Sequence, residues 1–231
     1  MNVNLIPDEQ NSLEIFNLEN DSEIGPSIKT IYDLLNKKDA NFIKYITILK
    51  RLDELIWNQN SSIDKLIQIN PDDAYLKLFI QCIDNILSSG KYVEITRIKG
   101  LFPEAYIFFR IKFDYKQYNK LVRECYVEID TWSSKNCRSA KQGQIVDVST
   151  WNSTREEGMT FECKSGITIK DYQLDLLDEI RTRSSNKMNI FLASFAGKEI
   201  INNRINEIKI TNPQLKTSGL NIFGVEEMMN L

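Results

Sequence analysis

Residues 144–166, QIVDVSTWNSTREEGMTFECKSG, decide the expected fold because they have the pattern of two β-strands joined by a hairpin. The first strand is predicted over residues 145–149, where Asp147 stands between two valines. The second strand is predicted over residues 159–165, after a polar connection that favours a turn. The stretch therefore predicts a hairpin at the centre of a β-sheet.

Three charged side chains in this hairpin, Asp147, Glu162 and Lys164, indicate a candidate metal-binding and catalytic site. Side chains alternate across a strand, so Glu162 and Lys164 share a face and Cys163 points the other way. If the strands pair, Asp147 lies beside Glu162, and two carboxylates repel unless a cation or a proton intervenes. A divalent ion of the magnesium type prefers such oxygen ligands. A neighbouring lysine could position the water that attacks a phosphodiester.

The spacing of these residues resembles the core of a known nuclease family. An aspartate followed after 14 intervening residues by Glu162-Cys163-Lys164 is similar to the pattern of the PD-(D/E)XK, or restriction-endonuclease-like, superfamily. The tripeptide also occurs as Asp114-Tyr115-Lys116 and as Glu207-Ile208-Lys209, but only the copy at Glu162 follows an aspartate on a predicted strand. The resemblance covers residues 114–211, and Val146 stands where the motif name has proline.

The resemblance implies a fold of class α/β (α+β), in which a restriction-endonuclease-like core has a mixed central β-sheet flanked by helices. It implies a metal-dependent endonuclease in which Asp147, Glu162 and the backbone carbonyl of Cys163 bind Mg²⁺ or Mn²⁺ and Lys164 assists hydrolysis. A helix before the first core strand often supplies another glutamate in this superfamily. With a helix predicted over residues 114–132, that glutamate is Glu124 or Glu128, unless both belong to an exposed helical face.

Further polar residues are candidates for binding the substrate. Several families of this type have a glutamine near the active site, at about the position of Gln173. Basic residues lie in the connection before the hairpin and near the C-terminal end: Arg138, Lys141 and Arg204. Contact with nucleic acid and a solvated or ion-paired surface position remain equally open for these basic residues.

Composition excludes several other hydrolases. The 231 residues contain no histidine, so a Ser-His-Asp triad and histidine-ligated zinc are excluded. The four cysteines contain no C-x-x-C pair, which favours free thiols in a reducing compartment. We find no apolar run long enough to span a bilayer and no signal-peptide pattern at the N-terminus, and so expect a cytoplasmic protein without a membrane partner.

Helical spacing and charge predict two domains. Residues 1–90 form a predicted helical N-terminal module, with helices over residues 27–36 and 40–58 and from residue 71, after a weakly ordered start. This part has 14 acidic and 8 basic residues, a net charge of −6, whereas residues 91–231 have 18 and 21, a net charge of +3. After the hairpin, the nuclease-like domain is predicted to continue as a helix over residues 167–183, a strand over 189–195, a helix over 197–206 and a strand over 207–211.

The expected nuclease would cleave DNA in preference to RNA, in restriction or in prokaryotic or phage defence. Two other functions are alternatives to it. The same fold could serve as a nucleic-acid-binding or assembly module with an inactive site. The acidic helical module could also bind a protein partner through its amphipathic helices, and a homodimer remains open. Titration with Mn²⁺ separates the first two functions, because converging carboxylates stabilise the fold when metal binds.

Overall fold

The chain forms two units of different composition. The computed structural model describes all residues except 58–71, 91–93, 115–117 and 137–143. One unit contains Met1–Ser12 together with Ile107–Leu231, and the other contains Leu13–Tyr106. This division differs from the predicted boundary at residue 90, because the helical unit extends to Tyr106 and the first twelve residues of the chain join the C-terminal part.

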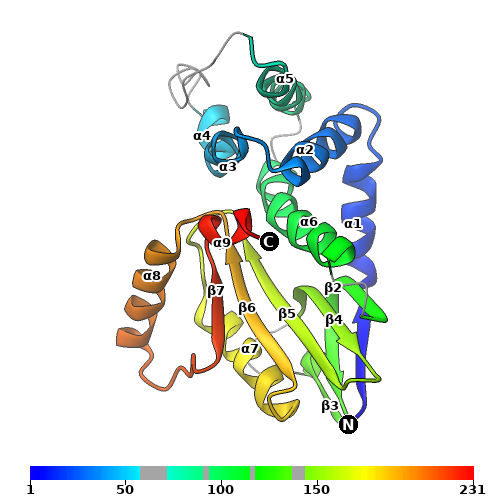
Figure 1. Ribbon diagram of the computed structural model, residues 1–231, viewed down its shortest axis with the longest axis vertical. Coiled ribbons are helices and arrows are strands. Elements are labelled where there is room, and N and C mark those ends of the chain that lie inside the picture. Colours follow the sequence, from blue (N-terminus) through cyan, green and yellow to red (C-terminus); the bar gives the residue numbers. More distant parts are fainter. Residues whose placement is uncertain (58–71, 91–93, 115–117, 137–143) are drawn as a thin grey trace. The chain divides into compact units, whose positions relative to one another are not determined.

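The first unit is built on a mixed sheet of seven strands. Along the main path the order is β1-β2-β4-β5-β6-β7, and the short β3 pairs with β2 (Figure 1). Pairing is antiparallel from β1 to β5 and parallel from β5 to β7. The strands are β1 (Val3–Pro7), β2 (Lys120–Ile129), β3 (Trp132–Ser133), β4 (Val146–Asn152), β5 (Glu157–Lys164), β6 (Met188–Ser194) and β7 (Leu220–Phe223).

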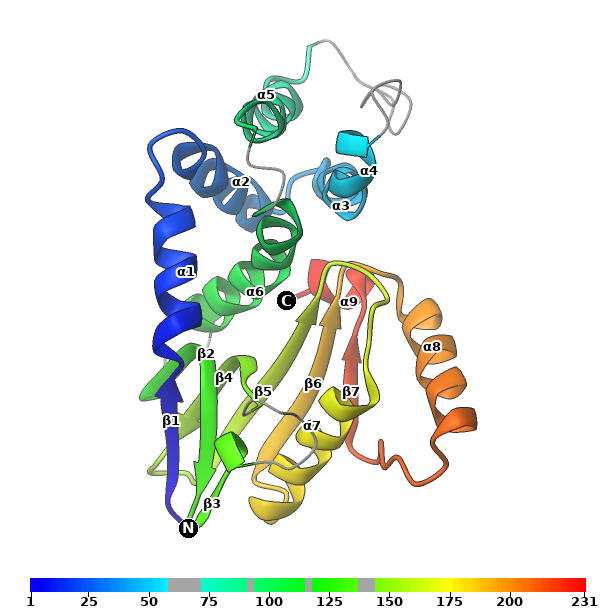
Figure 2. The ribbon, with the colours of Figure 1, turned by 180° about the vertical axis from the view of Figure 1, so that it is seen from behind.

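Helices α7 (Asp171–Arg183) and α8 (Lys198–Thr211) pack against this sheet, and the short α9 (Val225–Met229) follows β7. Figure 2 shows α7 in front of the sheet. Leu192 of β6 packs with Leu174 of α7 and with Ile201 and Ile205 of α8, so one apolar cluster joins both helices to the parallel part of the sheet. The fold is therefore a mixed α/β arrangement with a mixed seven-stranded sheet flanked by helices.

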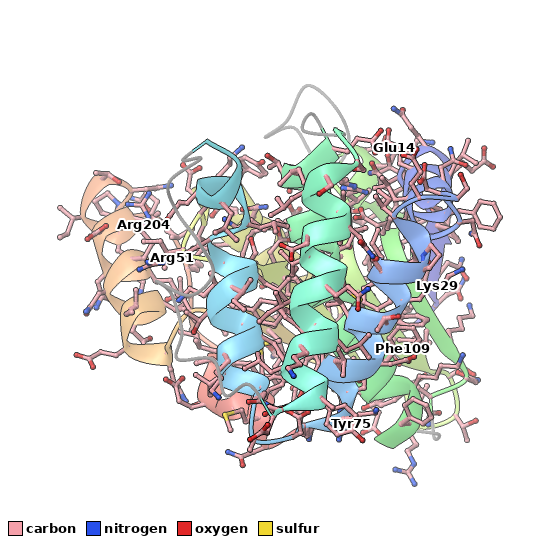
Figure 3. The ribbon with its side chains drawn as sticks, turned by 90° about the horizontal axis from the view of Figure 1, so that it is seen from above. Glu14, Lys29, Arg51, Tyr75, Phe109 and Arg204 are labelled. Atoms are coloured by element: carbon pink, nitrogen blue, oxygen red, sulfur yellow. The ribbon has the colours of Figure 1, made fainter. Side chains whose placement is uncertain are left out.

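The second unit is helical. Its elements are α2 (Gly25–Lys37), α3 (Phe42–Lys50), α4 (Leu52–Trp57) and α5 (Ala74–Ser88), with the larger parts of α1 (Glu9–Glu19) and α6 (Ile95–Asp114). Asp73 caps α5 by accepting a hydrogen bond from the backbone N–H of Leu76. Tyr45 and Phe79 stack with 4.4 Å between ring centroids, which joins α3 to α5 (viewed from above in Figure 3).

Four expectations for individual elements are corrected by the structure. Residues 120–129 of the predicted helix 114–132 form strand β2, and residues 207–211 belong to α8 and not to a strand. The predicted helix 40–58 divides into α3 and α4. The N-terminal stretch contains β1 and α1 and is not weakly ordered. The two strands of the hairpin, the helix after them and the strand at 189–195 are confirmed as β4, β5, α7 and β6.

Local sequence patterns explain the two incorrect predictions of element type, at residues 120–129 and 207–211. Buried residues alternate with more exposed ones along the second half of β2, but Glu124 interrupts this alternation and produces an apparent helical spacing. In α8 the buried isoleucines are Ile201, Ile205 and Ile208, a helical spacing that overrides the local alternation around residue 208. Within the described ranges, no helix has the length and apolar character needed to cross a bilayer.

Candidate metal centre

Three carboxylates lie on neighbouring antiparallel strands in one row. The pairs on either side of Glu124 in the β2–β4 ladder place it opposite Asp147. Extending the β4–β5 ladder by one residue places Asp147 opposite Glu162. Glu124 and Asp147 each have a carboxylate oxygen within 4.8 Å of the other. Residues directly opposite on antiparallel strands are near neighbours, so three acidic groups from three strands converge.

Hydrogen bonds fix the orientation of two of these carboxylates. Asp147 accepts a hydrogen bond from the backbone N–H of Cys163 on its Oδ2, at 2.5 Å. Glu162 Oε1 forms an ion pair with Lys164 Nζ and also accepts a hydrogen bond from Gln173 Nε2. Of the residues that the structure describes, none donates a hydrogen bond to Asp147 Oδ1 or Glu162 Oε2. Each of these two carboxylates is thus held by the protein through one of its oxygens.

The burial of these groups changes their titration. Glu124 and Glu162 are only 2% and 3% exposed. Burial, followed by repulsion from Asp147, raises the pKa of Glu162 to about 7, although Lys164 acts in the opposite direction. Burial by itself would lower the pKa of Lys164, but the attraction of Glu162 and Asp147 outweighs burial and raises it. The ammonium therefore remains charged at neutral pH, and the site has an excess of negative charge.

The backbone at Glu124 is strained. Its φ is +45°, a left-handed conformation that is uncommon for a residue with a side chain. Its carbonyl oxygen accepts a hydrogen bond from the N–H of Asp8, which follows β1, at 2.7 Å. Strained residues of this kind concentrate at functional sites, where the surrounding structure holds them in place. The strain at Glu124 therefore adds to the reasons for regarding the middle of β2 as a candidate functional region.

The donor set fits a hard divalent cation. Carboxylate oxygens are the ligands that Mg²⁺ and Mn²⁺ prefer, and Mg²⁺ needs only one or two carboxylates besides water and phosphate. Asp147 and Glu124 both act on Glu162 through their negative charge, and the single ammonium of Lys164 leaves a surplus that a cation would neutralise. The chemistry of Glu124, Asp147 and Glu162 is thus suited to one or two such ions.

The structure brings together some of the predicted site residues and separates others. Asp147, Glu162, Cys163 and Lys164 meet as expected, and Gln173 reaches Glu162 from α7. Glu124 also reaches Asp147, but from a strand and not from the predicted helix.

The remaining candidates have less connection with this centre. Glu128 lies opposite Asn4 of β1, about 13 Å along the strand from Glu124. Arg138 and Lys141 lie outside the described residues. Arg204 is on α8 (labelled in Figure 3), where it forms an exposed ion pair with Glu207 at 2.9 Å. Roles of these basic residues in substrate binding stay predictions.

One buried acidic residue, Glu104 of α6, is not among the predicted site residues. It is 5% exposed, and both Phe102 and Ala105 beside it are completely buried. The available signal was an acidic side chain within the apolar run LFPEAYIF, because carboxylates are seldom fully buried without a partner. Glu104 belongs to the helical unit.

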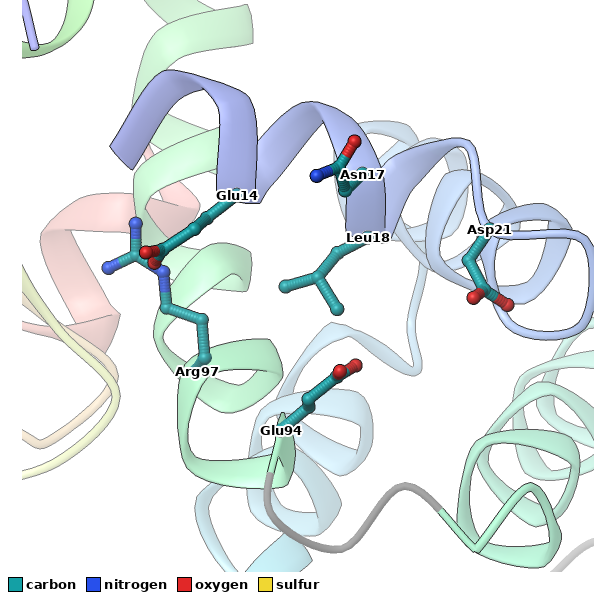
Figure 4. A pocket seen from close by; sticks show the side chains of 6 residues that line it. All are labelled: Glu14, Asn17, Leu18, Asp21, Glu94 and Arg97. Atoms are coloured by element: carbon teal, nitrogen blue, oxygen red, sulfur yellow. The ribbon is translucent and has the colours of Figure 1, made fainter. Parts of the chain in front are cut away.

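A pocket of about 320 Å³ lies in the helical unit (Figure 4). Glu14, Asn17, Leu18 and Asp21 line it from α1 and the residues after it, and Glu94 and Arg97 line it from the start of α6. The acidic and basic side chains of Glu14 and Arg97 point toward one another, so the pocket has no single sign of charge. It gives no indication of a particular ligand.

Comparison with known proteins provides little further information. No family model and no curated protein matches the chain. Among solved structures, the chain is similar to protein VC1899 from Vibrio cholerae, with a TM-score of 0.46 and 13% sequence identity. The match covers 99% of this chain and 56% of VC1899, so the chain spans about half the length of that protein. A similarity at this level carries no argument about function.

Proposed function

We propose that this chain is a metal-dependent nuclease of the PD-(D/E)XK type that hydrolyses phosphodiester bonds in nucleic acid, with DNA preferred to RNA. The observation that supports the proposal most strongly is the convergence of Asp147, Glu162 and Lys164 at one place on adjacent strands. The proposal combines this geometry with the resemblance of the aspartate and the Glu-Cys-Lys tripeptide to the superfamily pattern.

In the proposed site, the carboxylates of Asp147 and Glu162 would hold Mg²⁺ or Mn²⁺, with Glu124 as a further ligand. The Cys163 carbonyl, between the two charged residues of β5, is another candidate ligand. A bound ion supplies positive charge that neutralises the phosphate in the transition state, an effect worth several kcal/mol. The protein contributes the fixed orientation of the carboxylates, because Cys163 N–H holds Asp147 and Lys164 holds Glu162.

Lys164 has the role of a charged donor in this proposal. In the metal-free protein its raised pKa keeps the ammonium protonated at neutral pH, which is the state that donates hydrogen bonds. An ammonium can donate several hydrogen bonds, and only one donor direction is needed for Glu162. Another can orient the attacking water and stabilise the negative charge that develops on the phosphate.

The direct test is a cleavage assay with plasmid, single-stranded DNA and RNA, each with Mg²⁺, Mn²⁺ or chelator. We expect cleavage with either metal and none with chelator. Asp147→Asn and Lys164→Ala should each reduce the rate at least ~1,000-fold, because each removes an effect worth several kcal/mol in the transition state. Circular dichroism at low temperature checks that both variants fold.

Matched controls separate the site from general effects of charge. Asp175→Asn changes an aspartate of α7 outside the site, and Lys187→Ala changes the lysine of an exposed ion pair. Both controls should cleave at the wild-type rate. Undiminished cleavage by Asp147→Asn and Lys164→Ala would contradict the proposed site. Metal binding without cleavage of any substrate would instead favour a binding or assembly module with an inactive site.

A further inference from the structure

Gln173 connects the start of α7 to the candidate metal centre. Its Oε1 accepts a hydrogen bond from the backbone N–H of Lys170 at 3.1 Å, and its Nε2 donates to Glu162 Oε1. The backbone N–H of Gln173 also donates to the carbonyl oxygen of Lys170, at 3.2 Å. Gln173 is therefore the third residue of α7, bonded to the residue before the helix in the manner of a capping box.

These two partners fix the orientation of the side-chain amide. Lys170 N–H can only donate, so it requires the carbonyl oxygen of the amide, and the carboxylate of Glu162 requires its NH₂ group. Rotating the amide by 180° would break both hydrogen bonds. The side chain is thus held at both ends, and its two polar groups already have partners within the protein.

Both donors to Glu162 act on the same oxygen. Lys164 Nζ and Gln173 Nε2 approach Oε1 from β5 and from α7. Two donors on one oxygen restrict the rotation of the carboxylate about its last bond, and the other oxygen, Oε2, then has a defined direction. Glu162 is 3% exposed, so solvent could not provide this restraint.

We infer that Gln173 is a positioning residue for Glu162 and not a contact to the substrate. The inference rests on the proposed metal site and revises the role that the superfamily resemblance implies for this glutamine. Gln173 uses the backbone of Lys170 as an anchor and holds Glu162 Oε1, so that Oε2 would be the oxygen left for an ion. Residues that hydrogen-bond to metal ligands typically contribute 10–100-fold to metal affinity.

The test is calorimetric titration of Mn²⁺ into the full chain and its variants at one fixed pH. Gln173→Met keeps the length of the side chain but removes both hydrogen bonds. Gln173→Asn keeps an amide that is too short to reach both partners, and it serves if Gln173→Met does not fold. We expect Mn²⁺ affinity to fall about tenfold or more in Gln173→Met and by a smaller factor in Gln173→Asn.

Asp171→Ala is the matched control. Asp171 is at the start of the same helix and accepts a hydrogen bond from Tyr172 N–H, but it makes no contact with Glu162 among the described residues. Its loss should lower the thermal unfolding temperature, as we also expect for the Gln173 substitutions. It should leave Mn²⁺ affinity within about twofold of wild type, because it removes only helix capping and the interaction with the helix dipole. A role restricted to helix capping would give the same small effect on affinity for all three variants.

The outcomes distinguish this inference from the proposed function. Wild-type affinity in both Gln173 variants, or an equal loss in Asp171→Ala, would overturn the positioning role while leaving the metal site intact. Absence of Mn²⁺ binding by the wild-type chain would instead overturn the proposed function, on which the inference depends.

Discussion

The two ends of β5 each have a lysine–glutamate ion pair, and the two pairs differ in burial. At the C-terminal end, the Glu162 and Lys164 side chains are 4% and 18% exposed, whereas Glu156 and Lys187, just before β5 and β6, are 43% and 41% exposed. Burial raises the pKa of Glu162, but the hydrogen bond and charge of Lys187 lower the pKa of Glu156. The pKa values of Glu162 and Glu156, two glutamates that are each paired with a lysine, are therefore shifted in opposite directions.

The cause of this difference is the surroundings of the buried pair. Asp147 and Glu124 add negative charge near Glu162, while the exposed pair is screened by water and also has the N-terminal ammonium of Met1 as a neighbour, 3.9 Å from Glu156. An ion pair with surplus carboxylates inside a protein is costly to maintain. The proposed cation site would account for its presence, and the comparison suggests four measurements.

The largest effect is expected from removing the lysine of each pair in turn. Lys164→Met leaves buried carboxylates without their compensating charge, so we expect the free energy of unfolding to fall by roughly 3–5 kcal/mol at pH 8. Lys187→Met should produce no measurable change, because exposed ion pairs contribute little. Urea denaturation of both variants measures the difference. Equal losses would show that burial does not distinguish the two pairs.

The second measurement follows stability against pH with and without Mn²⁺. The pKa of Glu162 is raised from 4.5 to about 7, so the contribution of this group to stability is complete below about pH 4.5 and is lost as pH rises through about 7. The loss for the metal-free protein is on the order of 3 kcal/mol. Because the metal binds the deprotonated carboxylate, stabilisation by Mn²⁺ should increase over the same interval.

Thermal unfolding at each pH, with Glu162→Gln as the control, measures this dependence. The substitution removes the titrating group, so the decrease in metal-free stability between pH 4.5 and 7 should become smaller. If the pH dependence of metal-free stability persists unchanged in Glu162→Gln, it arises from the titration of another group.

The third measurement tests which glutamate of β2 adds to the buried charge. Glu124→Gln removes a carboxylate next to Asp147, and we expect Mn²⁺ affinity to weaken about tenfold, or about 1.4 kcal/mol. Glu128→Gln, four residues further along the same strand, should leave the affinity unchanged. Calorimetric titration of Mn²⁺ into both variants shows which of the two glutamates contributes to metal affinity. The reverse result would exclude Glu124 from the site.

The smallest effect concerns the exposed pair. The lowered pKa of Glu156 gives a contribution to stability that is present above about pH 4.5, its unfolded-state value, and is lost as pH falls. Glu156→Gln should therefore reduce stability slightly at neutral pH and converge with wild type in acid, and salt should diminish the difference. Denaturation at pH 3 and pH 7 tests this, and a larger loss in acid than at neutral pH would contradict it.

The sequence was most informative where local pattern and tertiary environment agree. Alternation around Asp147 and the short apolar run at residues 189–195 predicted β4 and β6 correctly. The helix after β5 that contains Gln173 followed from helical spacing, although it was predicted from residue 167 and begins at Asp171. Each of these signals lies within about ten residues along the chain, which is the range that periodicity can report.

Errors arose where the partner of a segment is remote in sequence. Strand β2 is paired with β1, more than one hundred residues earlier, and no local pattern in residues 120–129 reveals that pairing. The left-handed backbone of Glu124 also interrupts the alternation that would have indicated a strand. Consequently Glu124 was a candidate ligand on the basis of a helix that does not exist.

By itself, the sequence determined which chemical groups are present: carboxylates and a lysine without any histidine, at a spacing that puts Asp147, Glu162 and Lys164 on one hairpin. Only the tertiary structure decided that Glu124 joins them from β2 and that Gln173 holds Glu162 from α7. The physical reason is that covalent spacing fixes neighbours along a strand or a hairpin. Contacts between strands and helices that are remote in sequence depend instead on how the whole sheet assembles and buries its apolar faces.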